Sequence, residues 1–455
     1  MGKKFDFDLI VIGSGPAGSA AALSAAEHGL NIAIAENSSW GGTGVNTRDL
    51  PFCSATSFSN LYHDALLGSR FGLSSKTLRF NYPVFRKWLD LSKRRSGANS
   101  KKAFEKAGIT CLKGIAHFLS PYEVSIGEKI YSAKRFIISS GSVLYDGGII
   151  GAESVKCLTP ETALEISRLP KSIVIIGGGS TGCEFADFFA SLGVKVTVFE
   201  LSNHLLPKED SEAGNILEKY FEEEYKIKTL TEARVISVSS SDSGIKLIYL
   251  RGGLEKTLKA EEVLLATGSK PALDLGLGNA GVLFDKNGIL VNQFYQTTMK
   301  HIFAAGDCLG GESSSERVAF EGMAAALNLI KKTKYTADYN AFPRLTKTNP
   351  EIVSIGLTES QCKSKKIKFE KTFVPLSETP ASNTSDFRVG FLKLLVDKKK
   401  KTVLGAVLMC KDAELIAGEF ALIIKNGITV SEVARTPHIS SSFAELIHLA
   451  AQKSR

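Results

Sequence analysis

The chain has 455 residues, of which 44% are apolar, and a formal net charge of +9 at pH 7. This length is sufficient for three domains with cores of their own, and no run reaches the roughly 18 consecutive apolar residues of a membrane helix. The seven cysteines show neither a Cys-x-x-Cys pair nor metal-ligand spacing. We therefore expect reduced thiols, no bound metal ion and a cytoplasmic protein.

Two strands and a helix are predicted close to the N-terminus. An apolar run over residues 8–13 predicts a buried strand, and it starts so early that we expect no signal peptide. A glycine-rich turn follows, then small residues over 19–28 that predict a helix, and then a second apolar run over 31–35 that ends at Glu36. This order is the setting that a dinucleotide-binding turn requires.

The turn itself has the spacing Gly13-x-Gly15-x-x-Gly18. In a dinucleotide-binding turn, the first glycine makes the tight turn, the second lets the backbone approach a pyrophosphate, and the third lets the helix pack on the strand. The helix N-terminus faces the phosphates, and Glu36 is expected to bind a ribose 2′-hydroxyl. The alternative is a glycine-rich turn of an ordinary α/β domain.

A second copy of the pattern begins at residue 172. An apolar strand leads into Gly177-x-Gly179-x-x-Gly182, and a helix and a further strand follow. Glu200 ends that strand and favours NAD over NADP, because a carboxylate binds the ribose 2′-hydroxyl and repels a 2′-phosphate. No arginine follows Glu200 at close range, although basic residues further along leave NADP open as the alternative.

The order of motifs over essentially the whole chain resembles that of the FAD-dependent pyridine nucleotide-disulfide oxidoreductases, the group of dihydrolipoamide dehydrogenase and glutathione reductase. In these relatives the aspartate that matches Asp307 holds the ribityl chain of FAD. The segments that carry the resemblance lie at residues 13–18, 138–141, 177–182, 265–271, 302–307 and 348–357.

The resemblance implies an α/β fold with two Rossmann-like dinucleotide-binding domains and a C-terminal α+β dimerisation domain. We place the FAD-binding domain in residues 1–150 and 270–340, the NAD-binding domain in 151–269, and the dimerisation domain in 341–455. FAD and NAD are the implied cofactors, and a homodimer is the implied assembly. The residues assigned to cofactor binding are Gly13, Gly15, Gly18, Glu36, Gly42, Thr43, Ala116, Gly141, Gly177, Gly179, Gly182, Glu200, Gly268, Gly306 and Asp307.

The C-terminal region has strand signals at residues 371–374, 391–396 and 403–409, and helical patterns at 413–425 and 443–452. The basic run Lys398–Lys401 falls between two of these strands, so it predicts a solvated hairpin tip. The alternative, a nucleic-acid contact at this run, is not expected.

One departure from the family removes its redox-active thiols. The family pattern is Gly-Gly-Thr-Cys, four residues, and then Cys-x-Pro; Gly42, Thr43 and Pro51 fall on it, but Gly44 and Asp49 stand in place of the cysteines. Disulfide exchange needs one thiolate to attack sulfur and a second thiol to resolve the mixed disulfide. Glycine and aspartate supply neither, so dihydrolipoamide dehydrogenase activity is not expected.

A second departure lies four residues beyond Asp49. Lipoamide dehydrogenase relatives carry a lysine there, near the flavin and close to a glutamate of the nucleotide domain. In this chain Cys53 replaces the lysine, whereas Glu184 matches the glutamate. One helical turn separates Asp49 from Cys53, so we expect both to face the flavin. Cys53 is interpreted as a packing residue, with a lone redox thiol as the alternative.

A third departure removes the family's catalytic base. The relatives have a histidine five residues before a glutamate, and this chain has Ser440 five residues before Glu445. A serine hydroxyl has no useful basicity at neutral pH. His438 either compensates or is a surface or interface residue.

These departures leave chemistry that needs only flavin. The candidate catalytic residues are Glu184, Asp49, Cys53 and Glu445. The chain is predicted to be an FAD-dependent NAD(P)H oxidoreductase that passes hydride from NADH to flavin and then reduces a non-disulfide acceptor directly. A quinone, a dye, a metal complex, oxygen or a second nicotinamide would serve as that small-molecule acceptor. The alternative is a flavin-bound redox sensor or assembly protein with little turnover.

Overall fold

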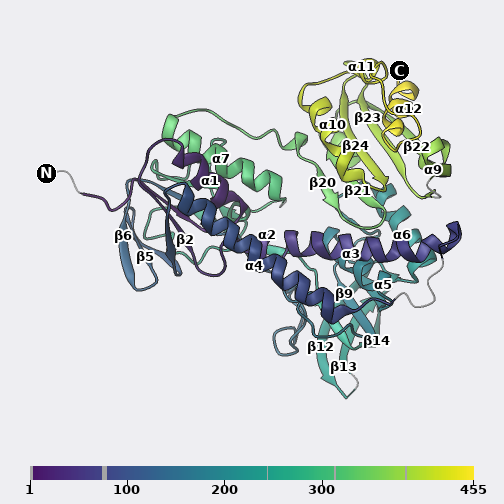
Figure 1. Cartoon of the computed structure of the whole chain (residues 1–455), viewed down its shortest axis with the longest axis horizontal. Helices are drawn as coiled ribbons and strands as arrows, with labels where there is room; N and C mark the ends of the chain where they lie inside the picture. The colour runs from purple at the N-terminus through teal and green to yellow at the C-terminus, as the bar shows by residue number, and fades with distance from the viewer. Residues whose placement is uncertain (1–3, 74–78, 243, 312–313, 385–386) are drawn as a thin grey trace. The chain divides into compact units, whose positions relative to one another are not determined.

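The computed structural model describes residues 4–73, 79–242, 244–311, 314–384 and 387–455. The chain divides into two compact units, each built from segments far apart in the sequence (Figure 1). The first unit comprises residues 1–54, 82–145 and 268–337, and the second comprises 55–81, 146–267 and 338–455. The predicted boundaries of three domains stay a prediction.

The first unit is built on a five-stranded parallel sheet in the order β19-β7-β1-β2-β3. Helices α1 and α7 lie side by side next to it (Figure 1), and a Cβ atom on Gly322 of α7 would lie 1.9 Å from the carbonyl oxygen of Ala17 in α1. The elements are β1 (Leu9–Ile12), α1 (Pro16–Ala26), β2 (Ile32–Glu36), α2 (Gly42–Asn46), α4 (Tyr82–Lys106), β3 (Thr110–Lys113), β4 (Ala116–Ser120), β5 (Glu123–Ile126), β6 (Lys129–Ser132), β7 (Phe136–Ile138), β8 (Ser142–Leu144), β16 (Ser269–Pro271), β17 (Phe284–Asp285), β18 (Gly288–Ile289), β19 (Ile302–Ala304), η2 (Asp307–Leu309) and α7 (Ser315–Lys331).

The second unit contains the second parallel sheet, β11-β10-β9-β15, and an antiparallel sheet, β12-β13-β14. Helix α3 (Asp49–Leu67) begins in the segment of the first unit and ends in that of the second. The further elements up to residue 267 are η1 (Gly68–Phe71), β9 (Ser172–Ile176), α5 (Ser180–Ser191), β10 (Lys195–Phe199), α6 (Ser211–Tyr225), β11 (Lys228–Leu230), β12 (Ala233–Ser241), β13 (Gly244–Arg251), β14 (Leu254–Ala260) and β15 (Glu262–Leu265).

The C-terminal part of the second unit is a five-stranded antiparallel sheet in the order β20-β21-β24-β23-β22, with α10 packed on β21 and β24 (Figure 1). Its apolar core includes Leu394, Leu408, Phe420 and Ile447. The elements are η3 (Tyr339–Ala341), β20 (Arg344–Thr346), β21 (Glu351–Gly356), α8 (Glu359–Ser364), β22 (Phe369–Pro375), η4 (Leu376–Glu378), α9 (Pro380–Thr384), β23 (Phe391–Asp397), β24 (Val403–Cys410), α10 (Ala413–Lys425), α11 (Val430–Val433) and α12 (Glu445–Lys453).

The predicted α/β fold class is confirmed, and the element ends shift by a few residues. The first helix begins at Pro16, three residues before the predicted start, because proline is well accommodated in the first turn of a helix. Strand β2 covers Ile32–Glu36, so it starts one residue later than the predicted run and includes Glu36 as its last residue. Residues 398–401 join β23 to β24, so the predicted hairpin tip is confirmed. The long helix α4 had no counterpart in the sequence-based prediction, and of α3 only the first turn, from Asp49 to Cys53, was expected.

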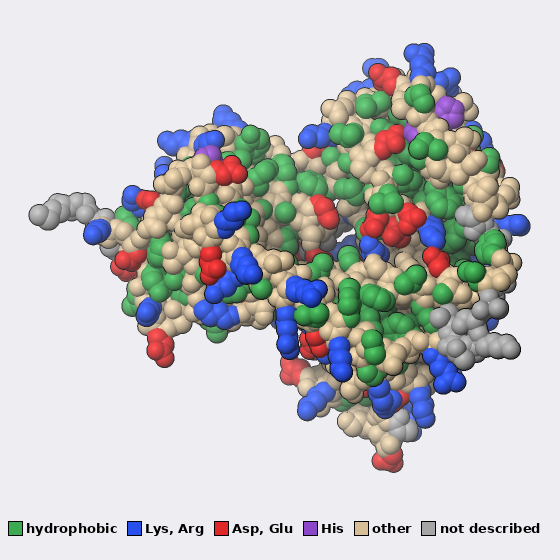
Figure 2. Space-filling view, in the orientation of Figure 1, with side chains coloured by type: hydrophobic (Ala, Val, Ile, Leu, Met, Phe, Trp, Pro, Cys, Tyr) green, Lys and Arg blue, Asp and Glu red, His purple; other side chains and the backbone are tan. Residues whose placement is uncertain are grey.

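The surface charges are mixed. On the face shown in Figure 2, lysine and arginine side chains alternate with acidic ones and with apolar side chains. Within the described residues, no helix is both long enough and apolar enough to cross a membrane.

Candidate functional site

The first glycine-rich turn, between β1 and α1, has the three steric environments that the motif predicts. Gly13 has a φ of +99°, and a Cβ atom there would lie 2.2 Å from the carbonyl oxygen of Ser139. A Cβ on Gly18 would lie 1.8 Å from the carbonyl oxygen of Gly13, whereas a Cβ on Gly15 would meet no atom within 4 Å. The fold therefore requires Gly13 and Gly18, and Gly15 leaves open space at the start of α1.

Glu36 is held against this turn. Its Oε2 atom accepts hydrogen bonds from the backbone nitrogen of Ser14 at 3.1 Å and from the Ser14 hydroxyl at 2.6 Å. Its Oε1 atom accepts from the backbone nitrogen of Ser38 at 2.7 Å. A carboxylate offers about four acceptor positions, so the buried Glu36 keeps capacity for a further donor such as a ribose hydroxyl.

The second turn, between β9 and α5, repeats the same geometry. Gly177 has a φ of +111°, and a Cβ there would lie 2.3 Å from the carbonyl oxygen of Ala266. A Cβ on Gly182 would lie 1.8 Å from the carbonyl oxygen of Gly177, and a Cβ on Gly179 would again meet no atom within 4 Å. Two sequence segments with little in common except their glycines thus adopt one turn design.

Glu200 takes the place at the second turn that Glu36 takes at the first. Its Oε2 atom accepts from the backbone nitrogen of Gly178 at 2.8 Å, and its Oε1 atom accepts from that of Ser202 at 2.7 Å. The carboxylate is buried, as that of Glu36 is.

Both turns fit a bound dinucleotide. The N-cap residues of α1 and α5 are Gly15 and Gly179, which have no side chain to cap the helix, so amide groups at the two helix starts are available to phosphate oxygens. Gly141 and Gly268, with φ values of +76° and +98°, also border open space, since a Cβ on either would meet no atom within 4 Å.

The flavin motif near residue 306 has an ordered polar setting. The Gly306 backbone nitrogen donates to Glu321 Oε2 at 2.9 Å. Asp307 begins η2, and its Oδ2 atom accepts from the Ser142 hydroxyl at 3.1 Å, which in turn accepts from Arg48 Nη1 at 3.4 Å. Sequence reasoning missed Ser142 and Arg48, because no motif spacing marks either residue.

The two positions at which the family has its cysteines are neighbours. Gly44 is buried in α2, and Asp49 is the exposed first residue of α3. A Cβ atom on Gly44 would lie 3.1 Å from Oδ2 of Asp49 and 3.1 Å from Cγ of Pro16 at the start of α1. Asp49 Oδ2 also accepts a short hydrogen bond from the hydroxyl of Ser315, the first residue of α7. The two positions that the resemblance assigns to cysteines are therefore close together in space, and here they are glycine and aspartate.

Two further predicted cofactor residues, Gly42 and Thr43, belong to α2, and a third, Ala116, lies in β4. Gly42 has a φ of +64°, and a Cβ there would lie 2.6 Å from Cα of Gly15, so α2 packs directly on the first glycine-rich turn. Thr43 is exposed next to it. Ala116 is buried at the start of β4, with 4% of its surface exposed.

Cys53 lies half-buried in α3, one turn after Asp49, as predicted. The seven cysteines form no disulfide with one another in the described part of the chain. Burial raises the pKa of Cys157 to about 11 and that of Cys308 to about 12, which keeps these two thiols protonated at neutral pH. Among the described residues, no group of three or more histidine, cysteine or acidic side chains is arranged to hold a metal ion.

Glu184 lies in the second unit, on α5. Its Oε1 atom accepts from the backbone nitrogen of Lys347 at 2.8 Å, and the ammonium of Lys347 lies 2.7 Å from Oε2 of Glu414. Asp187 follows on the same helix and accepts from the backbone nitrogen of Asn349 at 3.2 Å. Burial raises the pKa of Asp187 to about 8. Helix α5 therefore carries a second acidic residue besides Glu184, and this one is protonated at neutral pH. No sequence motif indicated it.

Glu445 keeps the pairing that the family motif implies, with serine in place of histidine. Its Oε2 atom accepts from the backbone nitrogen of Ser441 at 3.0 Å, and its Oε1 atom lies 3.5 Å from the Ser440 hydroxyl. His438 has only 4% of its side chain exposed, and its Nε2 atom lies 2.9 Å from Oε1 of Glu419. The ring is therefore buried within the chain and paired with a carboxylate instead of lying at the surface, and the alternative of an interface residue stays a prediction.

Comparison with known proteins extends over almost the whole chain. Residues 7–328 match the model of the pyridine nucleotide-disulphide oxidoreductases, and residues 342–451 match the dimerisation domain of that family. Dihydrolipoyl dehydrogenase 2 from mitochondria of Arabidopsis thaliana is 30% identical, over 98% of this chain and 90% of the relative. Mercuric reductase of Bacillus cereus is also 30% identical, over 98% of this chain and 71% of the relative.

Two solved structures share the fold. The Cu(II) complex of the HOCl-induced flavoprotein disulfide reductase RclA from Escherichia coli has a TM-score of 0.88 at 21% identity, covering 99% of each chain. LpdA from Mycobacterium tuberculosis has a TM-score of 0.86 at 24% identity, covering 98% of this chain and 99% of the other. With two dinucleotide turns of matching geometry and a C-terminal sheet that matches the dimerisation domain, the chain belongs to the pyridine nucleotide-disulphide oxidoreductase family, whose members bind FAD and NAD(P).

Proposed function

We propose that the protein is an FAD-dependent NADH oxidoreductase that reduces a non-disulfide acceptor directly. The observation that carries the proposal is the redox loop, where Gly44 and Asp49 keep the proximity of a cysteine pair and supply no thiol. A disulfide substrate would need an attacking thiolate and a resolving thiol at these positions.

The two glycine-rich turns would hold the two cofactors. FAD would be bound at the Gly13–Gly18 turn, with Glu36 on a ribose and Asp307 on the ribityl chain, and NADH at the Gly177–Gly182 turn with Glu200 on its ribose. Bound FAD supplies the ability to take a hydride and to release one or two electrons. The remaining cofactor roles, those of Gly42, Thr43, Ala116, Gly141, Gly268 and Gly306, rest on the same family pattern.

The altered C-terminal motif supports the same assignment. Ser440 stands beside Glu445 where the family has its base, and a serine hydroxyl cannot take and return a thiol proton as a histidine does. Some similar proteins are named for acceptors that are not disulfides: mercuric reductase, and leghemoglobin reductase of Glycine max, which is 28% identical over 98% of this chain and 87% of the relative. We favour a quinone-like acceptor, with dyes, metal complexes and a second nicotinamide in the same class of reaction.

The proposal includes a homodimer formed through residues 341–455, with Glu445 near the active site of the partner. It also includes an FAD-binding domain over residues 1–150 and 270–340 and an NAD-binding domain over 151–269. Glu184 would lie near the bound nicotinamide, where its carboxylate is oriented by the Lys347 backbone nitrogen.

The deciding experiment is an anaerobic titration of the FAD-loaded protein with NADH, followed by flavin absorbance. The proposal predicts rapid bleaching, subsequent dye or quinone turnover, and no lipoamide turnover. Alkylation of Cys53 should leave dye reduction largely intact, with a Cys53→Ser variant as the control for reaction at other thiols. Failure of both NADH and NADPH to bleach the flavin would instead identify a flavin-bound sensor, and loss of electron transfer on alkylating Cys53 alone would identify a one-cysteine mechanism.

A further inference from the structure

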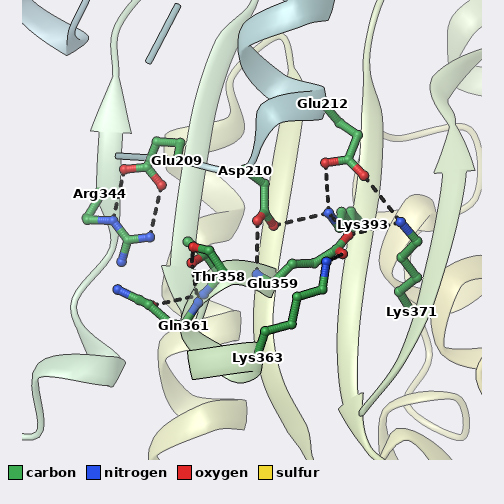
Figure 3. A network of polar contacts seen from close by, with 11 residues as sticks. Glu209, Asp210, Glu212, Arg344, Thr358, Glu359, Gln361, Lys363, Lys371 and Lys393 are labelled. Carbon is green, nitrogen blue, oxygen red and sulfur yellow. Dashed lines mark hydrogen bonds and ion pairs between the residues drawn. The ribbon is translucent and has the colours of Figure 1, made fainter. Parts of the chain in front are cut away.

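A buried lysine lies in the C-terminal sheet of the second unit, among acidic residues from other elements (Figure 3). Lys393, in β23, has 1% of its side chain exposed. Its ammonium lies 2.9 Å from Oε2 of Glu212, 3.2 Å from Oδ2 of Asp210 and 2.5 Å from Oε1 of Glu359. A buried ammonium of this kind is tolerated only when carboxylates compensate it, so β23 and the start of α6 are held together.

Asp210 is directed away from its own helix. It is the N-cap residue of α6, yet its side chain makes no capping hydrogen bond there. Its Oδ1 atom instead accepts from the backbone nitrogen of Glu359, the first residue of α8, at 3.0 Å. An N-cap aspartate normally stabilises its own helix, so the observed direction commits Asp210 to joining α6 to the C-terminal elements.

The preceding residue makes a second attachment. Arg344 of β20 donates from Nε to Oε1 of Glu209 at 2.9 Å and from Nη2 to Oε2 at 2.9 Å. This two-bond geometry fixes direction as well as distance, and both side chains are mostly buried, at 19% and 12% exposed. Figure 3 shows the two attachments at adjacent positions of the chain.

The segment that these attachments hold, residues 201–210, packs on the second glycine-rich turn. The backbone nitrogen of Leu206 donates to the carbonyl oxygen of Gly178 at 2.8 Å. A Cβ atom on Gly178 would lie 2.7 Å from Cδ2 of Leu205 and 3.0 Å from Cβ of Glu200. Any shift of this segment would therefore move the backbone that orients Glu200.

We propose that Arg344 and Lys393 are positioning residues for the nicotinamide nucleotide, since they hold residues 201–210 against the Gly178 turn and so fix the Glu200 carboxylate. The inference rests on the proposed function in that NAD is assigned to this turn. It gives the C-terminal region a role in nucleotide affinity in addition to dimerisation.

Two carboxylates of the network, Glu359 and Glu212, have their pKa values lowered by neighbouring lysines. Burial raises the pKa of Glu359, but hydrogen bonds from Lys393 and Lys371 outweigh this effect and hold it at about 2. Glu212 is affected in the same direction by the Lys393 ammonium, against the effect of its burial. Glu359 and Glu212 therefore stay ionised wherever NADH oxidation would be assayed.

Calorimetric titration of the FAD-loaded protein with NAD⁺ tests the inference without requiring electron transfer. Arg344→Met and Asp210→Asn should each weaken NAD⁺ binding about fivefold or more, since each tenfold loss corresponds to only ~1.4 kcal/mol. FAD content and the rate of flavin reduction at saturating NADH should be unchanged. Arg344→Lys keeps the charge but loses the paired bonds, so it should recover part of the affinity.

Lys371→Met is the matched control. Lys371 contacts Glu212 and Glu359 at 3.5 and 3.0 Å, in the same network, but it contacts neither Glu209 nor Asp210, so its removal should leave NAD⁺ affinity unchanged. Lys393→Met would leave three carboxylates without their buried ammonium and so destabilise the fold. Thermal unfolding therefore has to show that each variant is folded before its affinity is compared.

The outcomes separate this inference from the proposed function. Folded Arg344 and Asp210 variants with wild-type affinity overturn the inference, as does an equal loss in Lys371→Met. A wild type that binds no nicotinamide nucleotide also overturns it. A wild type that binds NAD⁺ without flavin reduction by NADH overturns only the proposed function, and the affinities of the variants still decide the role of Arg344 and Lys393.

Discussion

A Cβ atom on Gly44 would lie 3.1 Å from Oδ2 of Asp49. These residues occupy the two family cysteine positions, five apart in the sequence, and the start of α3 brings the second close to the first. The two positions therefore lie close together although neither residue carries a thiol. Ser315, which donates to Asp49, gives the replacement carboxylate a defined partner.

The retained proximity predicts that a disulfide can be rebuilt. Gly44→Cys with Asp49→Cys should lose two titratable thiols on oxidation, because a Cβ at position 44 lies 3.1 Å from an atom two bonds beyond Cβ of residue 49, which is compatible with the Cβ separation of about 3.5–4.5 Å that a disulfide needs. Thiol titration of the unfolded protein before and after reduction measures this. Gly44→Cys alone is the control. An oxidised double variant that keeps both thiols would show that the loop is not of the family geometry.

Asp49 should lower the reduction potential of bound flavin, because its negative charge opposes the anionic reduced form. Asp49→Asn keeps the side-chain shape and an acceptor for Ser315, so the potential should rise. For a two-electron couple, a change on the order of 1 kcal/mol corresponds to ~20 mV. Spectroelectrochemistry measures the shift, with Ser315→Ala as a comparison that keeps the charge. An unchanged or lower potential in Asp49→Asn would place the carboxylate away from the flavin.

The open positions in the two glycine-rich turns predict that FAD binding and NADH binding can be lost separately. At Gly15 and Gly179 a Cβ would meet no atom of the protein within 4 Å, so valine at either position should fold. Gly15→Val should abolish FAD binding by obstructing the pyrophosphate path. Gly179→Val should retain FAD but lose reduction by NADH. Its apparent affinity for NADH should fall at least about tenfold if ~1.4 kcal/mol of phosphate contact is lost.

Flavin absorbance per chain and anaerobic reduction provide the two measurements. Gly18→Val serves as the control for a position that the fold itself requires, since its Cβ would lie 1.8 Å from the Gly13 carbonyl oxygen. FAD loss in Gly179→Val with retention in Gly15→Val would reverse the assignment of the two turns.

Much of this architecture could be predicted from the sequence, because glycine spacing and strand periodicity are local signals. The turns at Gly13 and Gly177 need positive φ, and the sequence shows that need directly as glycine. The Asp210–Lys393 contact could not be predicted, because the 183 residues that separate the partners leave no periodic trace. Likewise, the sequence left His438 as a surface or interface residue, and only tertiary packing shows that its ring is buried against Glu419.

Glu200 should set the preference for NADH. Its carboxylate is held by the backbone nitrogens of Gly178 and Ser202, so it presents a fixed negative charge at the strand end. Glu200→Ala should weaken the binding of NADH and relieve repulsion of the 2′-phosphate of NADPH. The ratio of kcat/KM for NADH to kcat/KM for NADPH should therefore fall by about tenfold, or ~1.4 kcal/mol. Glu200→Gln is the matched variant that keeps shape and removes charge. A wild type that uses NADPH better than NADH would contradict the role given to Glu200.

Asp187 should make the folded protein less stable as the pH rises. Burial raises its pKa from 3.8 to about 8, so the folded state retains a proton that the unfolded state releases above pH 4. When the folded state binds more protons than the unfolded state, stability falls with rising pH, and here the fall extends from the unfolded pKa to the folded one. Asp187→Asn has no proton to lose and can still accept from the Asn349 backbone nitrogen.

At each pH the melting temperature of the wild type is compared with that of Asp187→Asn. Relative to the variant, the wild type should melt at progressively lower temperature between about pH 5 and pH 8 and level off above the folded pKa. Glu351 has its pKa raised to about 7 by burial and contributes in the same direction, so the two proteins must be compared at each pH. Glu351→Gln measures that second contribution separately. If the difference in melting temperature between the two proteins stays constant over this range, Asp187 is ionised in the folded protein. The interpretation of Asp187 as a protonated acid next to Glu184 would then be wrong.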